Sequence, residues 1–157
     1  SYSTTNNQIP GVDESDIMKN DGKWIYMLSH NKLQIIDAWP PDKAHRVSAT
    51  PLEGIPVSML TYKDRLVGFS VESDYQPECD YAYDCGVTGR GQGTIITTYD
   101  ITDRSGPVIL RRTYLPEGRF VNARRIGTQI YTAVFLKMND ISRLLDSSRL
   151  KYIPDVV

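Results

Sequence analysis

The sequence predicts an all-β fold made of repeated four-stranded antiparallel sheets. Two observations carry this prediction. Runs rich in aromatic and β-branched residues alternate with short turn signals, which is the pattern of β-hairpins, and the run Trp24–Leu28 after the turn Asp21–Gly22 is the clearest case. Units of this kind recur along the chain at a nearly constant spacing, so each unit is expected to form one sheet of a larger repeated fold.

The spacing of the units indicates which repeated fold this is. Lys23 and Arg65 each follow a turn pair and open an apolar run, and they lie 42 residues apart. Gln129 follows Arg65 by 64 residues, or by 45 when the 19 residues of a predicted insertion at 74–92 are left out. A four-stranded propeller blade takes about 40 to 45 residues. We therefore predict one domain over residues 1–157, a partial β-propeller of about two and a half antiparallel blades.

The first blade is expected to run from Asp16 to Gly54. A second hairpin turn is predicted at Ser29–Asn31, because Asn tolerates the left-handed backbone of a tight turn. The run Trp24–Leu28 is apolar on both faces, so we expect it to be buried between neighbouring sheets. The pair Thr50–Pro51 suits an outer edge strand, since proline cannot donate to an interior ladder.

The second blade is expected from Pro56 to Gly118 and ends in Glu-Gly, as the first does. Two strands of a third blade follow, the second of them at Ile130–Phe135. Apolar residues at i, i+3 and i+4 then predict a short C-terminal helix over residues 139–150. The polar residues 1–10 are interpreted as a leader segment that is ordered only where something docks it.

Composition limits the classes of function. The chain has a net charge of -1 and 24% charged residues, which is too neutral for the electrostatic footprint of a nucleic-acid-binding protein. No apolar run approaches the roughly 20 residues that a membrane-spanning helix needs. We expect neither nucleic-acid binding nor a membrane span.

Two cysteines, Cys79 and Cys85, fall within the predicted insertion. They lack C-x-x-C spacing and no histidine lies nearby to complete a zinc site, so a local disulfide is favoured over a metal or redox pair. Closing this short loop would contribute roughly 2 kcal/mol. A disulfide also indicates an oxidising compartment outside the cytoplasm.

The same insertion holds the predicted binding residues. Aromatic side chains on a loop stapled by a disulfide make contact surface at low entropic cost. The residues expected to bind a partner are Tyr75, Tyr81, Tyr83, Asp80 and Asp84. The alternative is a loop that only covers the edge of a blade.

An acidic group precedes the first blade. Asp13, Glu14 and Asp16, with Asp21 further on, offer hard oxygen atoms that calcium prefers as ligands. Their spacing is not that of an EF-hand loop. The favoured interpretation is that these carboxylates satisfy backbone donors and turns at the entry to the blade. No other cofactor is expected.

The sequence contains few groups of residues that could act in catalysis. His30 is expected in a hairpin turn and His45 in a loop before an edge strand, and no G-x-S-x-G motif occurs. Asp100 and Asp103 follow a predicted strand, where they are expected to cap a turn. The glycine-rich run at 89–93 lacks the Lys-Ser/Thr pair of a phosphate-binding loop. The sequence therefore favours a role other than catalysis.

Several runs resemble a known family, the secreted bacterial and archaeal proteins that carry a β-propeller domain distantly related to WD40 repeats. The runs concerned are Tyr2–Asn6, Gly11–Ile17, Asp21–Tyr26, Tyr99–Ser105 and Gly118–Gly127. The resemblance covers residues 2–136 and implies an extracytoplasmic propeller with no established catalytic residues. The cysteine-containing insertion departs from the pattern, as does an end at Val157 where a propeller is expected to continue.

Two functions from different classes follow. The preferred one is an extracytoplasmic propeller module acting in protein or ligand binding and assembly. The alternative is part of a propeller hydrolase or metal-dependent enzyme with its active site in the central channel. Closed propellers take typically 4 to 8 blades, so the end strands at Trp24–Leu28 and Ile130–Phe135 are expected to leave apolar faces uncovered. The expected partner is a protein, either the remaining blades of the same propeller or another copy.

The cysteine pair gives a testable prediction. Titration of thiols in the denatured, unreduced protein should detect none, because Cys79 and Cys85 are expected to be joined. The same titration after reduction should detect both. Two reactive thiols before reduction would contradict the disulfide.

Overall fold

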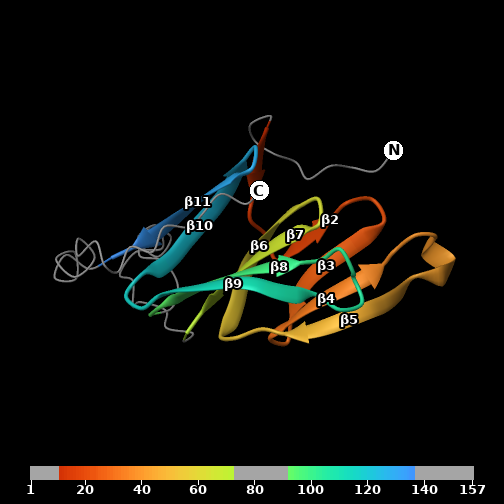
Figure 1. The fold of residues 1–157 in the computed structure, drawn as a ribbon, viewed down its shortest axis with the longest axis horizontal. Coiled ribbons are helices and arrows are strands. Elements are labelled where there is room, and N and C mark those ends of the chain that lie inside the picture. Colours follow the sequence, from red (N-terminus) through yellow and green to blue (C-terminus); the bar gives the residue numbers. More distant parts are fainter. Residues whose placement is uncertain (1–10, 73–91, 137–157) are drawn as a thin grey trace, which may run out of the picture.

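The computed structural model of this protein describes residues 11–72 and 92–136 (Figure 1). Across these residues the chain forms three antiparallel sheets of three or four strands and one short 3-10 turn. The predicted all-β partial propeller is confirmed. The predicted leader at 1–10 and helix at 139–150 lie outside the described residues, as does the predicted insertion at 74–92 apart from its last residue.

The first sheet corresponds to the first predicted blade. Its strands, in spatial order, are β2 (Met18–Asn20), β3 (Trp24–Ser29), β4 (Lys32–Asp37) and β5 (His45–Pro51). Gly22, with φ 94°, and Asn31, with φ 55°, take the left-handed backbone that the two tight turns require. The 3-10 turn η1 (Pro41–Lys43) joins β4 to the outer strand β5, which ends in Pro51 as predicted.

The second sheet repeats this arrangement. Its strands, in spatial order, are β6 (Ile55–Tyr62), β7 (Arg65–Val71), β8 (Thr94–Asp100) and β9 (Val108–Leu115). Strands β7 and β8 pair without a register shift from Arg65 opposite Asp100 to Val71 opposite Thr94. Beyond this pairing, the backbone N–H of Glu72 donates to the carbonyl of Gly93 at 3.1 Å. The hairpin is therefore complete on both sides of the predicted insertion.

The third sheet has the order β1-β10-β11. Strands β10 (Arg119–Ile126) and β11 (Gln129–Phe135) are the two strands predicted to begin a third blade. The third member, β1 (Val12–Glu14), comes from the opposite end of the described chain and pairs antiparallel with β10. The sequence did not predict β1, because three residues are too few to show a period.

Two apolar clusters hold the sheets together. The cluster shared by the first two sheets contains Tyr26, Leu28, Leu33, Ile35, Met59, Leu66, Tyr99 and Ile101. The cluster shared by the second and third sheets contains Leu60, Val67, Phe69, Val71, Ile96, Phe120 and Ala123. The rings of Phe69 and Phe120 lie 5.1 Å apart between their centroids, which is within the range of favourable aromatic pairs.

The position of each sheet between these clusters decides which strands are buried on both faces. Strand β7 lies between the two clusters and is buried from Leu66 to Val71. In β3, by contrast, Tyr26 and Leu28 are buried but Ile25 and Met27, on the other face, are only partly so. The prediction that Trp24–Leu28 is buried on both faces is wrong, because the first sheet has a neighbouring sheet on one face only in the described part of the chain.

Strand β11 is likewise exposed on one face. Ile130 packs against the second cluster, whereas Tyr131, on the opposite face, is 55% exposed. Across the sheet, Tyr131 lies opposite Arg124 of β10. The outward face of the third sheet also carries Ile126, which is 51% exposed, so the uncovered face expected for Ile130–Phe135 is a mixture of apolar, aromatic and charged side chains.

The segment from Val12 to Asn20 is hydrogen-bonded to all three sheets. Its first part, β1, lies beside β10, as the red and blue strands of Figure 1 show. Asp16 and Met59 of β6 then exchange two backbone hydrogen bonds of 3.1 and 2.7 Å. Its last part, β2, pairs with β3 in the first sheet. One short stretch therefore fixes the relative positions of the three sheets along their first strands.

This segment also buries a charge. The Lys19 side chain is only 3% exposed, and its ammonium donates to Asp13 Oδ1 at 2.8 Å and to the carbonyl of Glu14. Asp13, which is 13% exposed, also lies 3.5 Å from a guanidinium nitrogen of Arg125 on β10. Removing an ammonium from water costs several kcal/mol unless a partner charge compensates. Asp13 therefore compensates two cations from different sheets.

We predict that Asp13→Ala destabilises the fold by about 3 to 5 kcal/mol, because it leaves the buried Lys19 ammonium without its counter-ion. The control is Glu53→Ala, which breaks an ion pair whose two side chains are about half exposed and should cost about 1 kcal/mol or less. Urea unfolding at neutral pH measures both changes. Equal losses in the two variants would contradict a special role for the buried pair.

Candidate functional site

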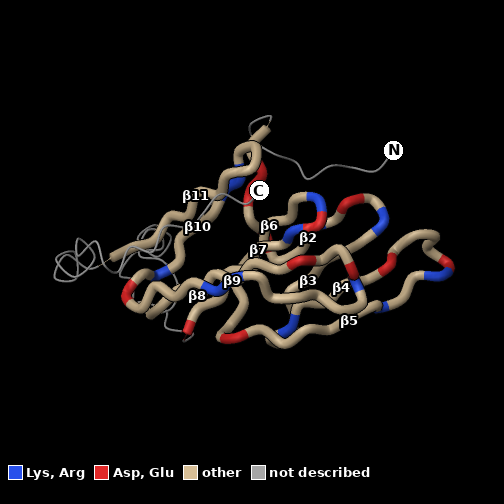
Figure 2. Tube along the Cα trace, viewed as in Figure 1, with Lys and Arg blue, Asp and Glu red and all other residues tan. Residues whose placement is uncertain are grey.

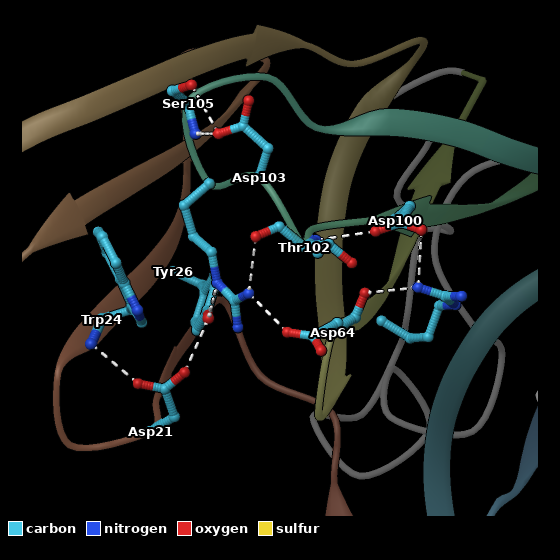
Figure 3. Close-up of polar contacts among 10 residues, drawn as sticks. Asp21, Trp24, Tyr26, Asp64, Asp100, Thr102, Asp103 and Ser105 are labelled. Atoms are coloured by element: carbon cyan, nitrogen blue, oxygen red, sulfur yellow. Dashed lines mark hydrogen bonds and ion pairs between the residues drawn. The ribbon is translucent and has the colours of Figure 1, made fainter.

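Polar side chains gather at two places where the first and second sheets meet. One is a network among hairpin turns, drawn in Figure 3. The other is a pocket at the opposite ends of the strands, beside the place where the predicted insertion begins and ends. Elsewhere in the described part of the chain, acidic and basic residues are interspersed along the sheets (Figure 2).

The network begins in the β2–β3 turn. Asp21 Oδ1 accepts a hydrogen bond from the backbone N–H of Trp24 at 2.8 Å, which closes the turn, and Asp21 Oδ2 accepts one from the Tyr26 hydroxyl at 2.8 Å (Figure 3). Arg104, from the loop between β8 and β9, donates to the same hydroxyl at 3.4 Å. The tyrosine thus joins a turn of the first sheet to a loop of the second.

Arg104 also connects two segments of the second sheet. Its guanidinium donates to Asp64 Oδ1 at 2.6 Å and to the carbonyl of Thr102 at 3.3 Å. The neighbouring Arg65 donates to the carbonyl of Asp64 at 3.0 Å and lies 2.9 Å from a carboxylate oxygen of Asp100. Asp64 and Asp100 thus hold Arg104 and Arg65 within the second sheet, while the hydrogen bond from Arg104 to Tyr26 joins the two blades.

The protonation states of the tyrosine and the aspartates suit the hydrogen bonds that they make. Burial, together with the Asp21 carboxylate, raises the pKa of Tyr26 to about 12 against the opposing effect of Arg104, so the hydroxyl stays protonated at neutral pH. The hydrogen bond from Thr102, followed by the charge of Arg65, lowers the pKa of Asp100. The Ser105 hydrogen bonds lower the pKa of Asp103. The prediction that Asp100 and Asp103 cap a turn is confirmed, since they accept from the backbone N–H groups of Thr102 and Ser105.

The pocket has a volume of about 240 Å³. It is lined by Glu53, Gly54, Glu72, Ile95, Arg112 and Tyr114. Arg112 forms an ion pair with Glu53, and the Tyr114 hydroxyl donates to Glu72 Oε2. That hydrogen bond is the main reason why the pKa of Tyr114 is raised, so Tyr114 acts as a neutral donor. One guanidinium and two carboxylates give the lining a net charge of -1.

Two glycines make this geometry possible. Gly54 has φ +72°, and a Cβ there would lie 2.6 Å from the carbonyl oxygen of Val71. A Cβ on Gly93 would lie 2.9 Å from the Tyr114 ring and 3.2 Å from Glu72 Oε2. Gly54, with its left-handed φ and a backbone oxygen in the way, therefore depends on glycine, whereas a Cβ at Gly93 would meet only the ends of two side chains, which would have to move.

The predicted acidic group has other partners. Asp13 pairs with Lys19 and Arg125, as described above, and Glu14 pairs with Arg124 of β10 at 2.9 Å. Asp16 Oδ1 accepts from the backbone N–H of Ile17 at 2.7 Å. Within residues 11–72 and 92–136, no three His, Cys, Asp or Glu side chains are grouped so that they could hold a metal ion. Asp16 and Asp21 accept from backbone donors, as the favoured interpretation expected.

The remaining predicted positions are separate from both groupings. His30 Nδ1 lies 2.7 Å from the Ser29 hydroxyl in the β3–β4 turn, and His45 Nδ1 lies 2.9 Å from the Lys43 carbonyl. The predicted binding residues Tyr75, Tyr81, Tyr83, Asp80 and Asp84 and the pair Cys79 and Cys85 lie outside the described residues.

Sequence reasoning missed the pocket. Its residues come from four separate stretches, and none of them forms a motif with its neighbours along the chain. The only signal was indirect, since Glu53–Gly54 was recognised as the end of a repeat. A central-channel active site, the alternative predicted from the sequence, would involve the inner strands. In the described part of the chain, two of these inner strands, β10 and the middle of β6, form backbone hydrogen bonds with the segment Val12–Asn20.

These features define a class of protein. Antiparallel four-stranded sheets that repeat along the chain, pack face to face and meet along their first strands are blades of a β-propeller. A protein-family model described as "Beta propeller domain" matches residues 2–155, and the chain belongs to this family. No curated protein and no solved structure matched the chain. In the described residues, no helix is long and apolar enough to cross a membrane.

The raised pKa of Tyr26 predicts that the fold loses stability at alkaline pH. The pKa of Tyr26 in the folded state lies above the value of about 10 for an unfolded tyrosine. Its stabilising effect is therefore fully present below pH 10 and is lost as the pH rises towards 12. Tyr26→Phe should lower the free energy of unfolding at pH 7 by about 1 kcal/mol, through the lost hydrogen bonds, and should flatten the alkaline loss.

Denaturant unfolding between pH 7 and pH 11 tests this. The control is Tyr131→Phe, which removes a hydroxyl bonded to Gln129 at the surface and should change the neutral-pH midpoint little. An alkaline loss of stability that is unchanged in Tyr26→Phe would show that the hydroxyl does not couple the two sheets.

Proposed function

We propose that this chain is an extracytoplasmic β-propeller module that binds protein and takes part in assembly. A run of exposed apolar residues on the outer strand of the second sheet carries the proposal. Val108, Ile109 and Leu110 of β9 are 60%, 57% and 52% exposed. Contiguous apolar surface of this kind is characteristic of contact sites.

The equivalent strand of the first sheet differs. Both β5 and β9 are outer strands that pair with a neighbour on one side only in the described residues. Strand β5 begins with His45 and Arg46 and ends with Pro51, which are side chains that protect an edge from unwanted pairing. Strand β9 carries Val108–Leu110 at the corresponding end. The contrast favours a partner specific to the second sheet.

The geometry of β9 favours packing of side chains over addition of a strand. The register between β8 and β9 shifts between Thr98 and Tyr99, which leaves Leu110 without a residue opposite it on β8. A bulge of this kind bends an edge and hinders continuous pairing. We therefore propose that the face of another sheet covers Val108–Leu110, either from the remaining blades of the propeller or from another copy.

Two further features support an extracytoplasmic binding role. The disulfide that the sequence predicts between Cys79 and Cys85 would require an oxidising compartment. The insertion that carries Tyr75, Tyr81 and Tyr83 leaves a β7–β8 hairpin whose pairing is complete without it. We expect the fold not to need this loop, which would leave it free to carry binding residues, so we include these tyrosines in the proposed contact surface.

The test is a charge placed on the exposed strand. Ile109→Lys combined with Leu110→Lys should reduce the apparent mass of the purified chain in light scattering towards that of a monomer, or release a copurifying fragment. The control is Ala49→Lys on β5, which is also an exposed outer-strand position and should leave assembly unchanged. A wild-type chain that is a stable monomer without a bound fragment would contradict the proposal, as would assembly that is insensitive to the β9 charges.

A further inference from the structure

The pocket formed by Glu53, Glu72, Arg112 and Tyr114 has no part in the proposed β9 contact. We propose that it binds a cationic group, an alkylammonium or guanidinium, carried on an aliphatic stem. This inference goes beyond the proposed function and does not depend on it. It follows from the charge, the shape and the construction of the pocket.

The charge of the pocket favours a cation. Glu53 and Arg112 compensate each other in an ion pair. The hydrogen bond that Glu72 accepts comes from the neutral hydroxyl of Tyr114, so no cation compensates its carboxylate among the described contacts. A carboxylate whose described partner is a neutral hydroxyl is a favourable neighbour for a positive group. Glu72 is therefore the expected anchor.

The shape favours a cation on an apolar stem. Ile95, which is 3% exposed, and the bare backbone of Gly54 line the pocket. The ring of Tyr114 forms part of the wall and is 43% exposed, so a cation can approach it. An ammonium or guanidinium over a tyrosine ring gains about 0.5 to 1 kcal/mol at an exposed site. The volume of about 240 Å³ holds several water molecules, which such a stem would displace.

Two hydrogen bonds hold the proposed anchor, Glu72, in place. Glu72 is fixed through its backbone N–H, which donates to Gly93, and through its carboxylate, which accepts from Tyr114. The contact between the Tyr114 hydroxyl and the carboxylate depends on the absence of a side chain at Gly93. A methyl group there would move the Tyr114 ring or the carboxylate, both of which are ends of flexible side chains. Gly93→Ala is therefore expected to alter the pocket while the β7–β8 hairpin persists.

The experiment uses the full chain and two matched probes. Nα-acetyl-lysine N-methylamide carries the proposed cation, and the norleucine analogue has the same stem without a charge. Titration followed by the NMR signals of Ile95 and Gly93 should give saturable binding of the lysine probe at least tenfold tighter than that of the norleucine probe. Equal affinities, or no saturable binding of the lysine probe, would overturn the proposal.

Variants then test the anchor. Glu72→Gln keeps an acceptor for Tyr114 but removes the charge, and it should weaken the lysine probe at least fivefold. Asp42→Asn makes the same change in charge in the turn η1, outside the pocket, and should alter affinity less than twofold. Gly93→Ala should weaken binding with little change in the thermal unfolding midpoint. Unchanged binding in Glu72→Gln would overturn the proposal.

A third probe distinguishes the sources of the cation. Tighter binding of a lysine-containing peptide than of free putrescine would indicate the side chain of a protein partner, and the reverse order would indicate a small amine. The Ile109→Lys and Leu110→Lys substitutions should leave probe binding unchanged, since they lie outside the pocket lining. Loss of assembly with intact probe binding, or the reverse, therefore separates this inference from the proposed function.

Discussion

The arrangement of the three sheets depends on the segment from Val12 to Asn20. Apolar contacts hold neighbouring blades face to face, but such contacts are not directional and do not fix how far one sheet slides past another. Backbone hydrogen bonds are directional, and this segment makes them to β10, to Met59 of β6 and to β3. The buried Lys19 adds a stricter requirement, because its ammonium is tolerated only where Asp13 meets it. Since Asp13 also faces Arg125, the ion pair forms correctly only when the first and third sheets are both in place.

The two ends of the blades have different chemistry. At the hairpin-turn end, Arg104 donates hydrogen bonds to the hydroxyl of Tyr26 and to the carboxylate of Asp64, and the tyrosine is neutral well beyond physiological pH. At this end, a side-chain hydrogen bond joins the first two sheets. At the opposite end, Glu72 and Tyr114 are among the residues that line a pocket with a net negative charge. The proposed binding pocket therefore lies where the chain leaves the sheet, which is a common place for binding residues. The hydrogen bond from Arg104 to Tyr26 at the other end joins the first two sheets.

Exposure along the strands follows from the neighbours that each sheet has. Strand β7 is buried on both faces because a sheet packs on each side of it, whereas β3 is buried on one face and β11 is partly buried on one face. The outward face of the third sheet combines Tyr131 with Arg124, side chains common at protein interfaces. Strand β9 instead exposes Val108–Leu110, which are purely aliphatic. These two surfaces differ enough in polarity to serve different contacts.

The sequence alone determined the blades. The 42-residue spacing from Lys23 to Arg65 and the turn residues Gly22 and Asn31 predicted the four-stranded sheets, because hairpins join residues that are near one another in the chain and leave a period of two. Only the tertiary structure decided the pairing of β1 with β10, where Ser15 contacts Asn122 from 107 residues away. It also decided that Lys19 is buried and that Glu53, Glu72, Arg112 and Tyr114 share a pocket. No local pattern records these outcomes, because burial and charge pairing depend on which sheet comes to lie beside each strand, and distant parts of the chain set that position.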